Sequence, residues 1–305
     1  MGQHCDVFVI GAGVAGMTAA EEAARRGLRV VLAEEAMFGG LVTNVNHLQP
    51  GPEGMPPSGA DLAADLMTKV ADAGIETAMT AVASVAALPS GELEIATGEQ
   101  SYRARCVIVA SGARLRTLGV PGEAEFEHRG VSHCADCDGP LFKGQTVVVV
   151  GGGDSALQEA AVLTEFCDAV HVIHRGSAFS ARQDFVRAVL ANARISVHFD
   201  TVVDAIEGES GVQAVRVRDV RSGSGSSLPC TGFFAYVGLE ANTSFLGAGV
   251  EMEAGRIAVN GDLETTLPNV YAIGAVRAGY GGEVAHAIED ARQAVNAVCG
   301  RLVRA

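Results

Sequence analysis

The chain has 305 residues, of which 48% are hydrophobic and 19% are charged, and 38 of them are glycine. This length and composition predict a folded protein of one large or two medium domains, with two as our working number, and disfavour a disordered chain. The formal net charge of −14 disfavours nucleic acids and anionic membranes as partners, because their phosphates are negative as well.

The sequence also argues against secretion. No apolar run approaches the roughly 20 residues that span a bilayer, and the first residues, MGQHCDVFVIGAG, enter a strand without the basic region of a signal peptide. The seven cysteines are odd in number and mostly solitary, which is not the pattern of a secreted disulfide framework. We therefore expect a cytoplasmic protein.

The first predicted element is an apolar strand, which continues into a glycine turn, a helix and a second strand over CDVFVIGAGVAGMTAAEEAARRGLRVVLAEE. This order is half of a Rossmann unit. Gly11, Gly13 and Gly16 fit the pattern G-x-G-x-x-G. In that pattern the first glycine allows the tight turn, the second lets the backbone approach a pyrophosphate, and the third permits close helix packing.

A second stretch repeats this order. Residues 146–175, TVVVVGGGDSALQEAAVLTEFCDAVHVIHR, have the same spacing at an offset of 140 residues. Gly151, Gly153 and Ala156 take the places of the three glycines, so both stretches fit G-x-G-x-x-G/A. One such motif is weak evidence, but two in register, each between a strand and a helix, indicate two dinucleotide sites.

The residue that ends the second strand of each stretch meets the adenosine ribose, and here the two stretches differ. Glu34 in the first suits a free ribose 2′-OH, as in FAD or NAD. His174 and Arg175 in the second favour a 2′-phosphate or at least do not repel one, although a solvated strand end would also carry them. We therefore expect FAD in the first site and a nicotinamide nucleotide in the second.

Two further predicted strands mark the domain boundaries. One ends at Gly112, and the other, within GFFAYVGLEANTSFL, ends near Gly238. We interpret them as the crossings between a discontinuous FAD-binding domain, 1–117 and 241–305, and an inserted NAD(P)H-binding domain, 118–240. The predicted fold class is α/β, with two Rossmann-like nucleotide-binding domains of the three-layer ββα type, the second inserted into the first.

Cys134 and Cys137 form a C-x-x-C pair within VSHCADCDGPLF, and three interpretations of it compete. A structural zinc site needs four ligands, but no second C-x-x-C or H-x-x-x-H pair exists, and His133 alone does not complete one. A cytosolic setting and the small loop disfavour a structural disulfide. A redox-active dithiol fits best, because C-x-x-C geometry lowers the pKa of one thiol and a flavin can exchange two electrons with the pair.

Asp138 directly follows the cysteine pair. The opening of a disulfide by reduction needs a proton donor, and this carboxyl is a candidate for it. The alternative interpretation is a turn residue before Gly139 and Pro140.

Taken together, these residues resemble the low-molecular-weight, flavin-dependent thioredoxin reductases, and the resemblance covers nearly the whole chain. Its most specific part is the central block that contains the cysteine pair and the second glycine motif. The motifs that carry it, in chain order, are GAGVAGMTAA, FGGLVTN, GPEGMPPSGADL, VIVASGARLRTLGVPGE, SHCADCDGPLFKGQTVVVVGGGDSALQEA and LPNVYAIGA.

The resemblance implies a homodimer in which FAD passes electrons from NADPH to the Cys134–Cys137 disulfide and on to thioredoxin or a related disulfide. It implies that Cys137 faces the flavin, that Cys134 attacks the disulfide of thioredoxin, and that Asp138 relays a proton. It also implies that the nucleotide domain rotates between reduction and delivery. No metal is expected.

The residues expected to contact the cofactors come from the two glycine motifs and from the motifs of the resemblance. For FAD they are Gly11, Gly13, Gly16, Glu34, Gly39, Gly40, Ala110, Gly112, Gly274 and Ala275. For the nicotinamide nucleotide they are Gly151, Gly153, Asp154, Ser155, His174 and Arg175.

The sequence departs from the family's pattern at the nicotinamide nucleotide. The family has His-Arg-Arg with a further Arg four residues later, whereas this chain has Gly176 and Ser180 at the last two of those positions. Arg182 is a possible substitute. The donor is therefore NADPH or NADH, with the choice open.

It departs at the flavin as well. Leu41 stands in place of a glutamine, Pro50 in place of an asparagine, Ala275 in place of an aspartate, and Glu283 within the stretch where the family has Arg-Gln-Ala. Four polar contacts to one cofactor are thus missing from the pattern. This indicates a divergent branch with a rearranged flavin site, electron donor or acceptor, unless backbone contacts compensate.

The leading hypothesis is an FAD-dependent dithiol/disulfide oxidoreductase enzyme of the thioredoxin-reductase type. Three alternatives stay open. The first is a dithiol oxidase that passes electrons through FAD to oxygen, and the second is a similar enzyme with a donor other than NADPH. The third is a non-catalytic, flavin-poor relative, suggested by Ala275.

Overall fold

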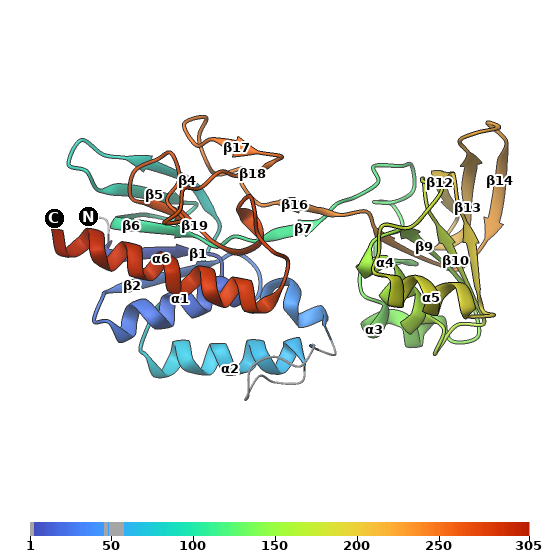
Figure 1. Cartoon of the computed structure of the whole chain (residues 1–305), viewed down its shortest axis with the longest axis horizontal. Helices are drawn as coiled ribbons and strands as arrows, with labels where there is room; N and C mark the ends of the chain where they lie inside the picture. The colour runs from blue at the N-terminus through green and yellow to red at the C-terminus, as the bar shows by residue number, and fades with distance from the viewer. Residues whose placement is uncertain (1–2, 46–47, 49–57, 305) are drawn as a thin grey trace. The chain divides into compact units, whose positions relative to one another are not determined.

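The computed structural model describes residues 3–45, 48 and 58–304, so Pro50 lies outside the described residues. The chain divides into two compact units (Figure 1), of which the first comprises Met1–Arg114 with Glu240–Ala305 and the second Leu115–Leu239. These boundaries lie three residues and one residue before those expected from the sequence. The strands at the crossings, β7 (Ala113–Leu115) and β16 (Leu239–Ala241), pair with each other.

The first unit is built on a seven-stranded sheet in the order β3-β2-β1-β6-β5-β4, with β19 also paired to β6. Its strands are β1 (Gln3–Ile10), β2 (Val30–Glu34), β3 (Glu76–Met79), β4 (Val82–Ala87), β5 (Leu93–Thr97), β6 (Ser101–Val109) and β19 (Val270–Ala272). Its helices are α1 (Val14–Arg25), α2 (Gly59–Asp72) and α6 (Val284–Arg304). A short pair, β17 (Met252–Glu253) and β18 (Arg256–Ile257), lies apart from this sheet.

The two faces of this sheet are covered differently. Along β1, Val7 and Val9 belong to the core shared with α1, α2 and α6, whereas Phe8 and Ile10 belong to the core shared with β4 and β5. This alternation is the period of two that a strand imposes on its side chains. Figure 1 shows the three helices together on one side of the sheet.

The second unit has a five-stranded sheet in the order β11-β10-β9-β15-β8, in which every pair is parallel. Its strands are β8 (Val131–Ser132), β9 (Thr146–Gly151), β10 (Ala169–Ile173), β11 (Ile195–His198) and β15 (Gly232–Tyr236). Its helices are α3 (Ala135–Asp138), α4 (Asp154–Leu163) and α5 (Gln183–Ala191). An antiparallel sheet is formed by β12 (Thr201–Gly208), β13 (Val212–Asp219) and β14 (Gly225–Pro229).

This sheet is also packed on both faces. Val147 and Val149 of β9 contact the core under α4 and α5, and Val148 and Val150 contact the core under the antiparallel sheet. Helices, a parallel sheet and a second sheet make the three layers expected. The predicted α/β fold class is confirmed, and none of the helices in the described part of the chain is long and apolar enough to cross a membrane.

Candidate active site

The cysteine pair lies at the start of α3, directly after the buried strand β8. Cys134 and Cys137 are joined by a disulfide, with their Cα atoms 5.3 Å apart. The Cys137 amide donates to Sγ of Cys134 at 3.1 Å, so the sulfur acts as the cap of this short helix. Cys137 is exposed and Cys134 is half-buried. The two sulfurs are thus bonded to each other, which is the oxidised form of a redox-active pair.

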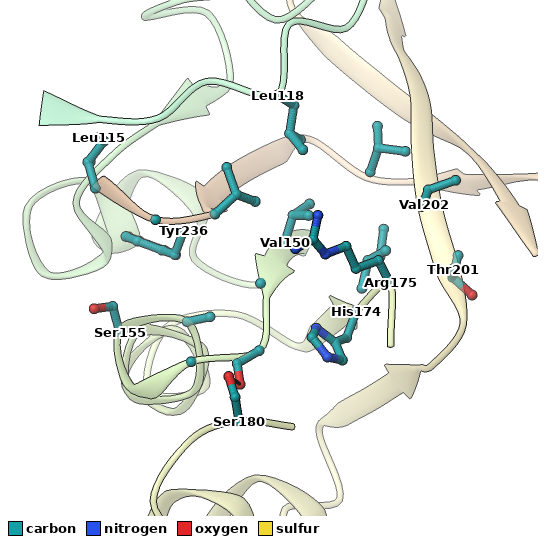
Figure 2. Close-up of a pocket in the computed structure, with 18 of the residues that line it drawn as sticks. Leu115, Leu118, Val150, Ser155, His174, Arg175, Ser180, Thr201, Val202 and Tyr236 are labelled. Atoms are coloured by element: carbon teal, nitrogen blue, oxygen red, sulfur yellow. Dashed lines mark hydrogen bonds between the residues drawn. The ribbon is translucent and has the colours of Figure 1, made fainter. Parts of the chain in front are cut away.

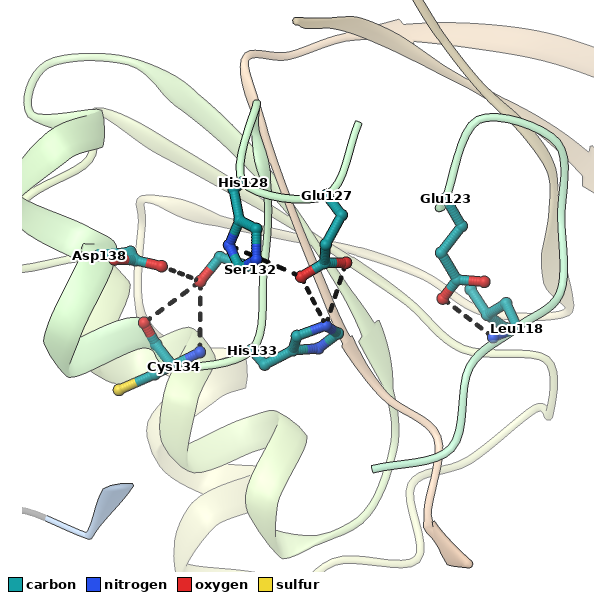
Figure 3. A network of polar contacts seen from close by, with 8 residues as sticks. All are labelled: Leu118, Glu123, Glu127, His128, Ser132, His133, Cys134 and Asp138. Carbon is teal, nitrogen blue, oxygen red and sulfur yellow. Dashed lines mark hydrogen bonds and ion pairs between the residues drawn. The ribbon is translucent and has the colours of Figure 1, made fainter. Parts of the chain in front are cut away.

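A residue of β8 binds the Asp138 carboxylate. Its Oδ2 accepts a hydrogen bond of 2.6 Å from the hydroxyl of Ser132, which in turn accepts one of 3.3 Å from the Cys134 amide (Figure 3). The Asp138 carboxylate makes no capping bond to the turn Gly139–Phe142 that follows it. Asp138 does directly precede this turn, so the turn interpretation stays open for its backbone, while its carboxylate binds Ser132, a partner that the sequence motif did not reveal.

His133 precedes the pair but turns away from it. Its Nε2 lies 3.2 Å from Oε1 of Glu127, and Figure 3 shows its ring and the Cys134 sulfur pointing in different directions. Its Nδ1 is buried and has no hydrogen-bond partner among the described residues. The structure thus places His133 in a contact with Glu127 and not at the sulfurs.

Glu159 of α4 is a second acid that the sequence motifs did not reveal. Its Oε2 accepts from the Ala135 amide at 3.0 Å and from the Tyr236 hydroxyl at 3.2 Å. Burial raises the pKa of this carboxyl, although both hydrogen bonds act in the opposite direction. Nothing in the sequence distinguishes Glu159 from the other polar residues of an amphipathic helix.

A cavity of about 600 Å³ lies in the second unit at the carboxyl ends of its parallel strands (Figure 2). It is lined by the glycine turn with Asp154 and Ser155, by His174 and Arg175, and by Tyr236. This is the edge at which open parallel sheets bind nucleotides. All six residues expected to contact the nicotinamide nucleotide border this one cavity.

The glycines of this turn are used differently. A methyl group on Gly151 would lie 2.4 Å from the Tyr236 carbonyl oxygen, so the turn packs against the end of β15. A methyl group on Gly153 would meet nothing within 4 Å. One glycine therefore serves close packing and the other leaves space for a ligand, which fits a dinucleotide.

The basic residues at the ribose end are unequal. His174 packs on Gly152, where a methyl group would lie 2.3 Å from its ring, and its Nε2 is 2.9 Å from the Ala178 carbonyl oxygen. Arg175 is exposed, and no hydrogen bond or ion pair to it is found in the described part of the chain. Arg182 pairs with Asp184 at 2.6 Å, so its guanidinium is already engaged.

The first glycine turn is the tightest point of the first unit. Gly11 has φ +99°, and a methyl group on it would lie 2.5 Å from the Ala110 carbonyl oxygen. One on Gly16 would lie 1.8 Å from the Gly11 carbonyl oxygen, whereas one on Gly13 would make only ordinary contact. Glu34 accepts a hydrogen bond of 2.7 Å from the Ala12 amide. These features fit the expected pyrophosphate and ribose contacts of FAD.

Other expected flavin contacts surround the same turn. Gly39 bridges to Gly13, and Gly40 and Gly274 approach α1 and its preceding turn. Gly112 has φ +65° and an open surrounding. The structure thus brings most of the predicted FAD residues together in one place.

Ala275, which has no carboxylate to offer, lies in a short turn, Gly274–Val276, and its carbonyl oxygen accepts a hydrogen bond from Arg256. Asp290 of α6 stabilises this turn and is only 4% exposed. Its carboxylate accepts hydrogen bonds from the Gly274 amide at 2.9 Å and from the Arg277 guanidinium at 2.6 Å. This buried pair is a support that the sequence motifs did not indicate.

The remaining five cysteines are unpaired. Four of them, Cys5, Cys106, Cys167 and Cys230, are buried, and Cys299 is half-buried. Burial raises the pKa of the Cys5 and Cys106 thiols to about 12, which keeps them in the unreactive thiol form. The disulfide-forming pair is therefore set apart from them chemically.

Comparisons with known proteins agree with this geometry. The family model described as pyridine nucleotide-disulphide oxidoreductase matches residues 5–297. The thioredoxin reductase of Treponema pallidum is 35% identical over 293 residues, which cover 96% of this chain and 95% of that protein. The thioredoxin reductase of Listeria innocua is 37% identical over 276 residues, which cover 90% of this chain and 86% of that protein.

Solved structures give the same answer. The thioredoxin reductase of Lactococcus lactis matches with a TM-score of 0.93 at 32% identity, covering 99% of this chain and all of that one. That of T. acidophilum matches with a TM-score of 0.90 at 30% identity, covering 99% of both chains. The resemblance seen in the sequence is confirmed.

Proposed function

The chain belongs to the pyridine nucleotide-disulphide oxidoreductase family, as an enzyme of the thioredoxin-reductase type, and from this premise we propose that Cys134 and Cys137 reduce thioredoxin or a related disulfide. The family implies a flavin and a pyridine nucleotide, and we assign FAD with NADPH or NADH. When bound, these cofactors supply hydride transfer and with it two electrons. The observation that carries the proposal is the disulfide at the start of α3, of which Cys137 is exposed.

In this proposal each unit holds one cofactor. The first unit, corresponding to the expected domain 1–117 and 241–305, holds FAD at the turn around Gly11 and Gly13 with Glu34 at the ribose. The second unit, corresponding to the expected domain 118–240, holds the nicotinamide nucleotide in its cavity. The tight packing at Gly11 and Gly151 and the room for a methyl group at Gly13 and Gly153 support both assignments.

We further propose that the enzyme discriminates weakly between NADPH and NADH. Arg175 offers one free guanidinium to a 2′-phosphate, while Gly176 and Ser180 offer no charge. Each missing charge-assisted contact forgoes about 1.5–3 kcal/mol when well formed. His174 is partly committed to the Ala178 carbonyl, which further limits its contribution.

The chemistry at the cysteines follows from thiol–disulfide exchange. In the dithiol form, the Cys134 thiolate attacks one sulfur of the substrate disulfide, so that a mixed disulfide forms and the S–S bond of the substrate breaks. Cys137 then attacks the Cys134 sulfur, which restores their disulfide and releases the substrate as a dithiol. The substrate gains two electrons and two protons, and the order of attack rests on the resemblance.

We assign Asp138 to proton transfer at the pair, because Ser132 fixes its carboxylate and no turn contact occupies it. A homodimer in the cytoplasm completes the proposal and rests on the resemblance and the cysteine pattern alone. Size-exclusion chromatography with light scattering tests the dimer.

The proposal is tested by the visible spectrum of the purified protein, followed anaerobically with NADPH and, separately, NADH. A yellow protein that either nucleotide bleaches, and whose disulfide-reducing activity is lost in the double variant C134S/C137S, supports it. Full activity in that double variant would overturn the role of the pair.

A dithiol oxidase is the second candidate, and the uncharged residues Gly176, Ser180 and Ala275 favour it. Its sign is oxygen consumption with a small dithiol in the absence of any nicotinamide nucleotide. A protein that reduces thioredoxin with NADPH and consumes no oxygen with dithiols would exclude it.

A further inference from the structure

A chain of two hydrogen bonds joins the redox disulfide to the nucleotide cavity within the second unit. Its centre is Oε2 of Glu159, which accepts from the Ala135 amide at 3.0 Å and from the Tyr236 hydroxyl at 3.2 Å. Ala135 lies between the two cysteines in the chain and is fully buried. Tyr236 is one of the residues that line the cavity. One carboxylate oxygen thus touches both the backbone of the redox pair and the wall of the cavity.

The contact to Ala135 fixes the start of α3. The first amides of a helix have no partner inside the helix, and the amide of Ala135 is buried away from water. Removing this charged acceptor would leave the buried amide without a hydrogen-bond partner, which is unfavourable. Burial raises the pKa of this Glu159 carboxyl, which α4 directs toward the start of α3.

The contact to Tyr236 reaches the nucleotide side. Tyr236 ends β15, pairs in the sheet with Gly151, and is 9% exposed. Gly151 belongs to the glycine turn, and its packing against the Tyr236 carbonyl leaves no space for a methyl group. A ligand on this turn therefore lies next to the end of β15, and the Tyr236 hydroxyl at that end donates to Glu159.

We propose that Glu159 is a positioning residue for the Cys134–Cys137 pair and that, through Tyr236, it links the redox state of the pair to nucleotide binding. The link rests on the proposed function, since it assumes that the cavity takes a nicotinamide nucleotide.

The link follows from what reduction does at α3. The S–S bond breaks, two electrons enter, and each sulfur that ends as a thiol takes up a proton. The two sulfurs then separate, and any shift of the backbone that carries them reaches Glu159 through the Ala135 amide. If the disulfide and dithiol forms place that amide differently, they place Glu159 and Tyr236 differently, and the nucleotide binds the two forms unequally. By linkage, the nucleotide then shifts the redox equilibrium of the pair by the same factor.

The test measures that equilibrium with ADP-ribose and its 2′-phosphate, which carry the pyrophosphate but no nicotinamide and so exchange no hydride. The FAD-loaded protein is equilibrated anaerobically in mixtures of reduced and oxidised dithiothreitol, and its thiols are trapped by alkylation. Mass spectrometry of the peptide that contains Cys134 and Cys137 then gives the reduced fraction. Calorimetry checks separately that the ligand binds.

The measured quantity is the ratio of reduced to oxidised dithiothreitol at which half of the Cys134–Cys137 pair is reduced. In the wild-type protein, we expect saturating ligand to shift this ratio by about fivefold or more. In Tyr236→Phe, which keeps the ring and removes the hydroxyl, this shift should vanish. Glu159→Ala should abolish the shift and also move the half-reduction ratio without ligand, whereas Glu159→Gln, which keeps an acceptor, should restore much of both. The control is Gln158→Ala, an exposed neighbour on α4, which should behave as the wild type.

Two results would overturn the inference. A ligand that binds but leaves the wild-type equilibrium unchanged removes the link, and identical half-reduction ratios in Glu159→Ala and wild type remove the positioning role. Failure of both ligands to bind would instead contradict the proposed nucleotide site and the link with it. The comparison of Glu159→Ala with Glu159→Gln still decides the positioning role in that case.

Discussion

The Ser132 hydroxyl donates a hydrogen bond of 2.6 Å to Oδ2 of Asp138, the carboxyl that directly follows the redox pair. Ser132 is 5% exposed, so this bond is sheltered from water. Ser132 belongs to β8, which precedes the cysteine pair in the sequence, whereas Asp138 follows the pair. The proposed proton donor is thus oriented by the strand that precedes the cysteines.

Ser132→Ala should lower kcat for disulfide reduction by about tenfold, because a hydrogen bond to a charged group contributes about 1.5–3 kcal/mol and its loss frees the carboxylate. KM for the disulfide substrate should stay unchanged, since Ser132 is buried. Steady-state kinetics measure both quantities. Ser101→Ala, at an exposed strand start, serves as the control. A kcat within twofold of wild type would contradict the role given to Ser132.

The first glycine turn offers a matched pair of substitutions. Gly16→Ala places a methyl group 1.8 Å from the Gly11 carbonyl oxygen and should destabilise the first unit by about 1–3 kcal/mol. Gly13→Ala meets only the Gly39 carbonyl oxygen at 3.8 Å, so the free energy of unfolding should change little while FAD affinity falls. Urea unfolding and FAD titration separate the two effects. Equal destabilisation by both would contradict the assignment of Gly13 to the cofactor.

Arg175 should carry the remaining preference for a 2′-phosphate. Arg175→Ala should weaken binding of 2′,5′-ADP by about tenfold and leave binding of ADP nearly unchanged, because a charge-assisted contact contributes about 1.5–3 kcal/mol. Calorimetry with both ligands measures the difference without any redox step. If the two affinities fall equally, Arg175 does not contact the 2′ position.

A pair of histidines predicts a pH dependence in the second unit. Nδ1 of His171 lies 3.0 Å from Nε2 of His198, and burial lowers the pKa of both rings. The unfolded chain therefore binds protons more readily than the folded one, so stability is full above the unfolded pKa of about 6.5 and is lost as the pH falls below it.

Urea unfolding at a series of pH values from 7.5 to 5 checks this prediction, with the free energy of unfolding taken from the transition of the second unit. His198→Phe removes one titrating ring and the shared contact, and it should flatten the slope of stability against pH. His128→Phe, an exposed histidine of the same unit, is the control. A wild-type stability that does not fall toward pH 5 would contradict the lowered pKa values.

The sequence predicted what is local and repeated. The two strand–turn–helix stretches around Gly11 and Gly151 were predictable because their signals lie within about thirty residues and follow the known needs of a phosphate turn. The cysteine pair was predictable for the same reason. Both stretches appear as β1–α1–β2 and β9–α4–β10.

Contacts between distant segments were not predictable. Glu159 reaches Ala135 across 24 positions and Tyr236 across 77, and no short pattern encodes either approach. Asp290 supports the turn of Ala275 from α6 in the same way. His174 illustrates a different limit, because its position in the motif suggested a ligand contact while its ring also packs on Gly152. Such roles depend on the packing of the folded chain.

The most direct test of the central claim is to trap the thiols after anaerobic reduction. The FAD-loaded protein is mixed with NADPH or NADH, alkylated, and digested for mass spectrometry. We predict that Cys134 and Cys137 become alkylated only when nucleotide is present, while the buried Cys5 and Cys106 stay unmodified. A flavin that is bleached by the nucleotide while the Cys134–Cys137 disulfide stays intact would contradict the account.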